Sequence, residues 1–599
     1  MVEMREKVVH VIKRIGYIAV TILLLIALMA SFYREETAYA LRWNPIATIV
    51  FAVLAIVLAL TEKKFGYYSW IWQGIRNWIS SAREIKKEEK AWKFFLHLSS
   101  AAVTLVTVLM IGSFIWFEIF LRATIILSFA ATFVSVALQL TDRIILGRGA
   151  EFAKLFLVIA LLAGLMFSYT EPPALYVSWD DCVHFDCVLD WVHIFDQEMT
   201  YAESQIFTYR GHPGLPGYMY TEQPHTYLQE ILQGSNVAVS NTSDIRGLYS
   251  SIGYSPMILV VGLLSLLGSD IIKFLVLSRL ANVLVYSFII YRGIRKLKRG
   301  AMIFSVVCLL PTAFFLACTH NYDFWLTAWF AYSFATLFAA LQRTDRKLCP
   351  SDLWRVLLGL FLACGPKALY CAMIFPLLFI GKDNYENPAH AKRFRIWTLL
   401  TVGVILVTLV APALGNPDIY TDHRFANNGH ISTGEQISFI LSNPFEYAKM
   451  LLSFLLDYLS FYMMNTHSVF YLFLGLSHTI FGTAITFLLL YCVFTDRTKD
   501  DGYEKMQKLR WFTIFFCFAQ IALVATSMYV GVTPVGQETI DGCQFRYLFP
   551  LMLPFCFFLT PKKIYCEISP KFQAVVVYGG LALVLLGSYF NAYLTQFLL

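Results

Sequence analysis

The sequence has few charged residues for its length. Asp, Glu, Lys and Arg make up 15% of 599 residues, whereas a water-soluble domain averages about 25%. Hydrophobic residues reach 58%, and the mean hydropathy is +0.61. A soluble globular protein could not bury this much apolar surface, and a disordered chain, a coiled coil or a secreted disulfide scaffold would not have this composition. The chain is therefore predicted to be an all-α polytopic membrane protein.

Several functional patterns are absent as well. The 12 cysteines form no CxxC and no Cys/His zinc pattern, and most lie inside apolar runs, where a thiol behaves as a small hydrophobe. No glycine-rich nucleotide loop and no internal repeat are visible, and the lack of a repeat argues against an inverted-repeat transporter. The first apolar run, 15–32, is followed by no small-residue cleavage site, so it is predicted to be a retained span.

Apolar runs long enough to cross a bilayer recur along the chain and predict about 13–15 membrane helices. A short helical pair between 354 and 381 is broken at Gly365-Pro366, because proline lacks an amide and restricts its neighbour. Two further apolar stretches, 254–268 and 436–464, are predicted to lie at the outer interface. The main predicted spans are 15–32, 44–61, 94–115, 122–140, 155–170, 271–291, 301–319, 324–341, 396–412, 477–495, 511–530, 545–560 and 572–590.

Basic residues gather in short loops between these spans. All of these loops can be cytoplasmic if the N-terminus is also cytoplasmic, as the positive-inside rule favours. The segments 171–270, 413–476 and 531–545 are then extracytoplasmic, and the protein is a multi-pass protein of the cell membrane. The basic loops are 62–93, 141–154, 292–300, 342–355, 382–395, 496–510 and 561–571.

Two regions are predicted. Residues 1–150 form an N-terminal four-helix membrane unit whose basic link, Phe65 to Lys93, is either an amphipathic helix on the cytoplasmic surface or an ordinary linker. Residues 151–599 form the transmembrane core, with the large outer loop 171–270 as its first loop.

An acid pair stands out in that first outer loop. Asp180 and Asp181 follow Trp179 and precede His184. Two adjacent carboxylates outside a membrane can bind a divalent cation, act as a general base, or simply be hydrated. His184 can donate to a phosphate or cap a helix.

A further acid and several cations are predicted on the same side. Asp323 begins a span, where Asp323 or Asn321 can cap a helix or take part in a site. Arg546 opens an apolar run from the outside, where the helix dipole disfavours a cation. A phosphate would compensate this charge, as would a salt bridge to Glu538 or Asp541. The other outer cations, which are either phosphate ligands or snorkelling residues, are Arg279, Lys367 and Arg424.

These motifs, in this order, resemble the GT-C superfamily of multispanning glycosyltransferases, and most closely a bacterial branch of membrane proteins of unknown function. The resemblance covers about residues 155–560. Trp179, Asp181 and Phe545 stand where the branch has Pro, Glu and Gly. The matching residues are Asp180, His184 and Phe185; Tyr254 and Pro256; Arg279, Leu280 and Asn282; Asn321, Tyr322 and Asp323; Lys367; Gln436, Asn443 and Pro444; and Gln544, Arg546, Tyr547 and Pro550.

The resemblance implies a GT-C-like helical bundle and an inverting glycosyltransferase. Its donor would be a polyprenyl-phosphate-linked sugar, and its acceptor a cell-envelope glycan, teichoic acid or glycolipid. No nucleic-acid partner and no required cofactor are expected, although a divalent cation can bind at Asp180 and Asp181. Either of these two aspartates is the catalytic base. The donor phosphate and substrate would be bound by His184, Arg279, Asp323, Lys367, Gln544, Arg546 and Tyr547.

Two other functions stay open. A transporter or flippase for lipid-linked saccharides shares the apolar mass and the outer cations, but it would favour charges at the bilayer midplane over an acid pair in an outer loop. An enzyme that ligates or polymerises whole glycans differs only in its donor, which the sequence does not identify.

Overall fold

A computed structural model describes residues 149–195, 198–208, 222–233, 237–240, 247–415, 429–496, 503–561 and 570–593. The predicted N-terminal unit, its basic link and the first four predicted spans lie outside these residues. The described part is dominated by helices, and its only strands, β1 (Glu198–Thr200) and β2 (Ala238–Ser240), pair antiparallel with Met199 opposite Val239.

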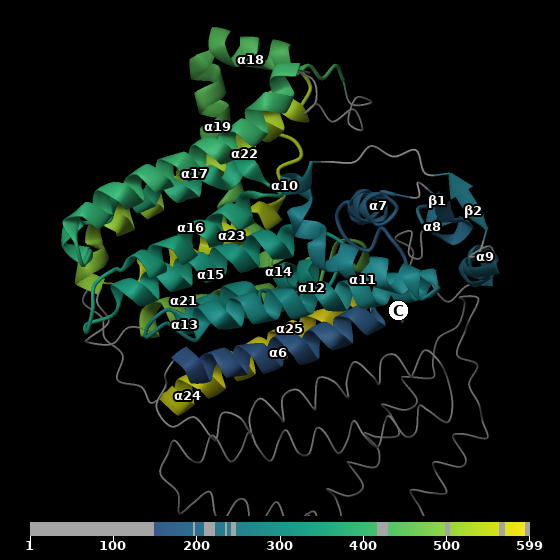
Figure 1. Cartoon of the computed structure of the whole chain (residues 1–599), viewed down its shortest axis with the longest axis horizontal. Helices are drawn as coiled ribbons and strands as arrows, with labels where there is room; N and C mark the ends of the chain where they lie inside the picture. Colours follow the sequence, from purple (N-terminus) through teal and green to yellow (C-terminus); the bar gives the residue numbers. More distant parts are fainter. Residues whose placement is uncertain are drawn as a thin grey trace, which may run out of the picture. The chain divides into compact units, whose positions relative to one another are not determined.

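The helices are distributed along the whole described chain (Figure 1). Their order is α6 (Gly149–Thr170), α7 (Asp181–Val192), α8 (Tyr201–Gln205), α9 (Glu222–Gln233), α10 (Leu248–Ser251), η2 (Ile252–Tyr254), α11 (Ser255–Leu266), α12 (Ile271–Ile294), α13 (Ala301–Cys308), α14 (Pro311–Ala317), α15 (Asp323–Leu341), α16 (Pro350–Cys364), η3 (Ala368–Phe379), η4 (Lys382–Asn384), α17 (Pro388–Gly415), α18 (Thr433–Ser442), α19 (Pro444–Tyr458), α20 (Phe461–His467), η7 (Leu472–Leu474), α21 (Thr479–Thr495), η8 (Tyr503–Met506), α22 (Gln507–Gly531), η9 (Phe545–Leu548), α23 (Phe549–Leu559), α24 (Pro570–Ala574), η10 (Val575–Gly579) and α25 (Gly580–Tyr593).

Within the described residues, 7 helices are long and apolar enough to cross a membrane. They confirm the prediction of an all-α polytopic membrane protein. Shorter apolar helices cover the predicted spans 477–495 and 545–560, and α16 with η3 forms the predicted short pair. The long ones are Ala150–Ser168, Leu248–Leu266, Ile271–Ile294, Asp323–Leu341, Pro388–Pro412, Gln507–Gly531 and Phe572–Ala592.

Two predicted segments differ from the structure. The predicted span 301–319 is divided into α13 and α14, because Pro311 has no amide to continue a helix and instead begins a new one. The stretch 254–268 is predicted to be a short interfacial helix. It is preceded by α10 and η2, so the helical stretch Leu248–Leu266 reaches 19 residues, which by length and composition is enough to cross a membrane.

The centre of the bundle is α15, which is the most deeply buried of the long apolar helices. It packs against α12 and α16, and α12 packs in turn against α6 and α11. Close contacts are made at glycines: a Cβ on Gly293 would lie 3.0 Å from the Tyr332 Cα, and one on Gly359 would lie 2.2 Å from the Ser333 Oγ.

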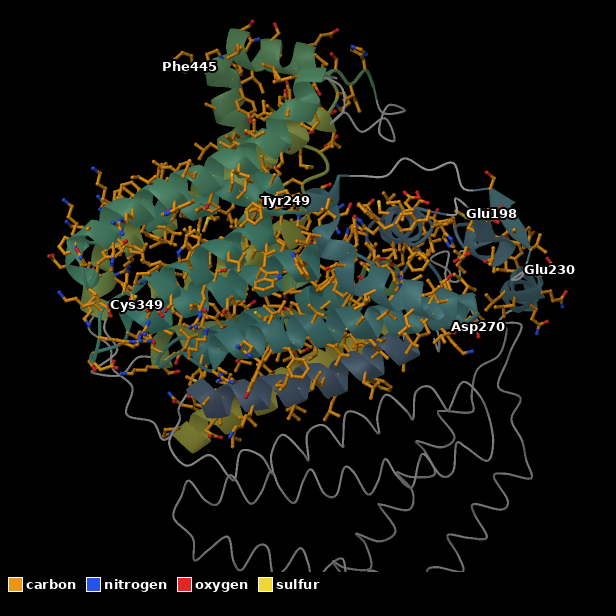
Figure 2. The ribbon with its side chains drawn as sticks, in the orientation of Figure 1. Glu198, Glu230, Tyr249, Asp270, Cys349 and Phe445 are labelled. Atoms are coloured by element: carbon orange, nitrogen blue, oxygen red, sulfur yellow. The ribbon has the colours of Figure 1, made fainter. Side chains whose placement is uncertain are left out.

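The long helices place two sets of loops at opposite ends of the bundle. Figure 2 shows Asp270, which caps α12, at one end and Cys349, which precedes α16, at the other. At the Asp270 end, the segment after α6, the start of α15, the turn between α16 and η3, and η9 converge. This convergence brings together the polar residues described next.

Candidate functional site

Arg546 lies at the centre of a charged cluster. It is the second residue of η9, and its side chain is only 4% exposed. Its Nη2 donates to Asp180 Oδ2 at 3.3 Å, and its Nη1 lies 3.0 Å from Asp323 Oδ2. One guanidinium therefore joins the loop before α7 to the start of α15.

Lys367 is the second cation of the cluster. Its Nζ donates to Asp323 Oδ1 at 2.6 Å and lies 4.2 Å from the centre of the Tyr547 ring. Asp323 is thus held between a lysine and an arginine, one on each carboxylate oxygen. We call Asp180, Asp323, Lys367 and Arg546 the charged cluster.

The local sequence explains the position of Asp323. Asn321 Oδ1 accepts a hydrogen bond from the Asp323 amide at 2.8 Å, which closes the turn before α15. Asp323 is then the first residue of α15, where a carboxylate is favoured by the helix dipole. The N-cap of α15 is Tyr322, with no capping hydrogen bond from a side chain, so neither Asn321 nor Asp323 is the N-cap; the Asp323 side chain instead contacts the two cations.

Asp180 has an unusual backbone. Its φ is 57°, in the left-handed region, which Asp tolerates better than most residues. It precedes α7, yet its side chain caps no amide of that helix. Its carboxylate pairs with Arg546 instead and is 31% exposed. Asp180 is therefore the more solvent-accessible of the two carboxylates in the charged cluster.

Asp181 contacts a different set of groups. Its side chain is fully buried, and Oδ2 accepts from the Ser178 amide at 2.6 Å. Burial raises the pKa of Asp181 to about 6, with the nearby Arg279 opposing the shift. The adjacent aspartates thus point to different surroundings, and a divalent cation shared between them stays a prediction.

Arg279 lies with Asp181 rather than in the charged cluster. Its guanidinium donates to the carbonyls of Pro172 and Ala174, both at 2.9 Å, and its Nε lies 3.7 Å from Glu171 Oε2. Burial raises the pKa of Glu171 well above its usual value. Arg279 therefore holds the chain after α6, the segment that leads to Asp180.

His184 adjoins the charged cluster as a neutral group. Its Nδ1 is hydrogen-bonded to the Tyr254 hydroxyl at 2.7 Å, and its ring packs edge-on against Tyr322. Burial and then the nearby Arg546 lower the pKa of His184 to about 3. At neutral pH its imidazole is therefore uncharged and can donate or accept only as a polar group.

Gln544 and Tyr547 flank Arg546. The Tyr458 hydroxyl donates to the Gln544 carbonyl at 2.6 Å, and the Tyr370 hydroxyl donates to the Tyr547 carbonyl at 2.7 Å. These bonds fix the backbone of η9. Gln544 Oε1 is buried and accepts no hydrogen bond from the described residues.

Aromatic residues line one side of the charged cluster and were not predicted as site residues. The Arg546 guanidinium lies 5.3 Å from the Trp179 ring, which packs edge-on against Phe470. His467 packs edge-on against Phe470 and stacks on Phe545. The only sequence signal was their position in predicted outer loops, since no spacing links Trp179 to residues several hundred positions later.

The charged cluster has spare capacity for an anion. Arg546 Nε is a buried donor with no hydrogen-bond acceptor among the described residues, while Nη1 faces Asp323 Oδ2 as an ion pair. Burial, opposed by Asp323, lowers the pKa of Lys367 to about 8, so Lys367 keeps its proton below that pH and loses it above. Two adjacent cations suit phosphate oxygens. Among the described residues, no group of three His, Cys, Asp or Glu side chains is placed to hold a metal ion.

A family of predicted membrane proteins, DUF2142, matches residues 210–554. The chain belongs to this family. The family match contains Asp323, Lys367 and Arg546 of the charged cluster, while Asp180 precedes it. Comparison with curated proteins and with solved structures finds no match.

Proposed function

We propose that the protein is a membrane glycosyltransferase of the GT-C type. It would take a sugar from a polyprenyl-phosphate-linked donor and transfer it to a cell-envelope glycan, teichoic acid or glycolipid on the extracytoplasmic face. The observation that carries this proposal is the charged cluster. It combines a buried arginine, a second cation and a partly exposed carboxylate at the ends of membrane helices.

In this mechanism the cations bind the donor phosphate. Arg546 and Lys367 neutralise the charge that develops on the phosphate as the bond from the anomeric carbon to the phosphate oxygen breaks. The polyprenyl phosphate leaves with the bonding electrons, and its lipid tail stays in the bilayer. Trp179, beside Arg546, offers a ring face to the sugar.

Asp180 is the proposed base. It would take the proton of the acceptor hydroxyl as that oxygen attacks the anomeric carbon from the side opposite the phosphate, so the sugar inverts. Its partial exposure leaves it reachable by an acceptor, whereas Asp181 is buried against the Ser178 amide. Asp180 now pairs with Arg546, so phosphate binding to Arg546 would free the carboxylate for proton transfer.

The main alternative is a flippase for lipid-linked saccharides. The charged cluster is less suited to it, because these groups lie at helix ends rather than along a path through the bilayer. Arg279 is a fully buried charged residue of α12, and its guanidinium donates to the backbone carbonyls of Pro172 and Ala174. It is therefore not available to line a path for a substrate.

An assay of the full chain in proteoliposomes distinguishes the transferase from the flippase. We expect a polyprenyl-phosphate-linked sugar to be consumed, with release of polyprenyl phosphate and labelling of an added envelope glycan. A control uses donor without acceptor. If the donor instead crosses the bilayer chemically unchanged and no polyprenyl phosphate appears, the flippase is correct and the transferase is not.

The proposed orientation has its own test. A cysteine at Glu230, which is exposed and lies in the predicted outer loop, should react with a membrane-impermeant thiol reagent in intact cells. A cysteine at the exposed Lys298 should react only after permeabilisation. The unsubstituted chain measures the background of its 12 native cysteines. Labelling in the opposite sense would place the charged cluster on the cytoplasmic face.

A further inference from the structure

A second basic region lies at the other end of the bundle. The charged cluster includes the first residue of α15, and Arg343 lies two residues beyond the last residue of that helix, Leu341. With a rise of about 1.5 Å per residue, the ends of α15 are separated by roughly the thickness of a bilayer core. Figure 2 labels Cys349 at this end.

The chain forms an open cleft here of about 480 Å³. Its walls come from the loop after α15, from η4 with the residue before it, and from the start of α22 with Lys505 of η8. Pockets for small ligands usually have volumes of about 300–1,000 Å³. The cleft is thus large enough for a phosphate together with the group esterified to it.

The lining of the cleft is strongly basic. Among the described residues that line the cleft, Asp383 is the one acidic residue. The basic residues of the cleft are Arg343, Arg346, Lys347, Lys505 and Lys508. Arg343 is paired with Asp352 at 2.5 Å, but no acidic partner among the described residues is recorded for Arg346, Lys347 or Lys508, which are all exposed. An excess of positive charge therefore faces the hollow.

Polar backbone and amide groups complete the cleft. Lys505 Nζ donates to the Arg343 carbonyl at 2.8 Å, and Asn384 Nδ2 donates to the Lys505 carbonyl at 3.3 Å, so the three walls are joined. Gln507 Nε2 is a buried donor with no acceptor among the described residues. A buried donor without a partner is costly, and a bound anion would satisfy it.

We propose that this cleft binds a phosphate group, carried either by an anionic lipid or by a soluble phosphate ester, at the end of the bundle opposite the charged cluster. The positive-inside rule accounts for basic loops at one membrane face. It does not account for basic residues from distant segments meeting around one hollow, one of whose lining residues, Gln507, has an unpaired amide nitrogen. Charge and shape together therefore indicate a binding site, independent of the proposed transferase activity.

The test uses the full chain in nanodiscs of zwitterionic lipid. The double variant Arg346→Gln with Lys508→Gln removes two cleft cations that make no described side-chain pair. The matched control, Lys298→Gln with Lys392→Gln, removes two exposed charges outside the cleft, one in the loop after α12 and one near the start of α17. The probes are inorganic phosphate, short-chain phosphatidic acid and, as a neutral control, short-chain phosphatidylcholine.

We expect one of the two phosphate probes to raise the thermal unfolding midpoint, and the cleft variant to bind it about tenfold more weakly for each phosphate-contacting cation that is lost. The control variant should bind like the unsubstituted chain. Tighter binding of phosphatidic acid identifies a lipid headgroup, and a cleft-dependent response to inorganic phosphate alone identifies a soluble ligand. No response to either probe, or equal losses in both variants, would overturn the proposal.

Discussion

Replacing Arg546 with alanine is expected to reduce sugar transfer by about 30- to 1,000-fold, which corresponds to ~2–4 kcal/mol of lost stabilisation. The reason is geometric. Arg546 is the one residue of the charged cluster that contacts both Asp180 and Asp323, and its Nε is a buried donor without a hydrogen bond among the described residues. Its removal leaves one cation, Lys367, against two carboxylates, so a phosphate would meet net negative charge. Transfer rate and donor affinity should be measured on the purified variant.

Arg546→Lys should restore only part of the loss, since an ammonium cannot reach two carboxylates and a phosphate with a planar set of donors. Lys273→Ala is the matched control, because Lys273 is an exposed cation at the same end of the bundle that pairs with Asp270. Normal folding is checked by the unfolding midpoint. Full transfer by both Arg546 variants would mean that Arg546 serves only to hold the chain together.

The fold was largely predictable from hydropathy, because lipid requires long apolar helices whose backbone groups bond within the helix. Hydropathy alone predicted the spans that correspond to α6, α12, α15, α17 and α22. Hydropathy could not predict where a helix breaks inside an apolar run. At Pro311 the chain stays buried and apolar on both sides, so only the missing amide marks the division between α13 and α14.

The meeting of Asp323, Lys367 and Arg546 was partly predictable, since each was expected where a span meets the same face. Their actual contacts depend on packing between segments far apart in sequence. Asp180 has a left-handed backbone, with φ 57°, and its carboxylate accepts from Arg546, whereas the carboxylate of Asp181 accepts from the Ser178 amide. Arg279 was predicted to be another outer cation that binds phosphate. In the structure it lies within α12, and its guanidinium donates to the carbonyls of Pro172 and Ala174, just after α6.

The base is tested by Asp180→Asn, which should lower the transfer rate about 10²–10⁴-fold. Asparagine suits this position because it also tolerates the left-handed backbone, so the turn before α7 should persist. The amide oxygen can still accept from Arg546, but the variant has lost the group that takes the acceptor's proton. Donor binding should survive or tighten, because Arg546 then has one less negative competitor for the phosphate.

Two matched variants separate this effect from general damage. Asp270→Asn changes an exposed carboxylate at the same end of the bundle and should leave the transfer rate unchanged. Asp181→Asn changes the buried neighbour whose contact is the Ser178 amide, so it should alter the unfolding midpoint more than the transfer rate. Loss of transfer with retained donor binding in Asp180→Asn alone identifies Asp180 as the base. The same pattern in Asp181→Asn alone would require the loop before α7 to rearrange during the reaction. Full transfer in both variants would leave the charged cluster without its base and favour the flippase over the transferase.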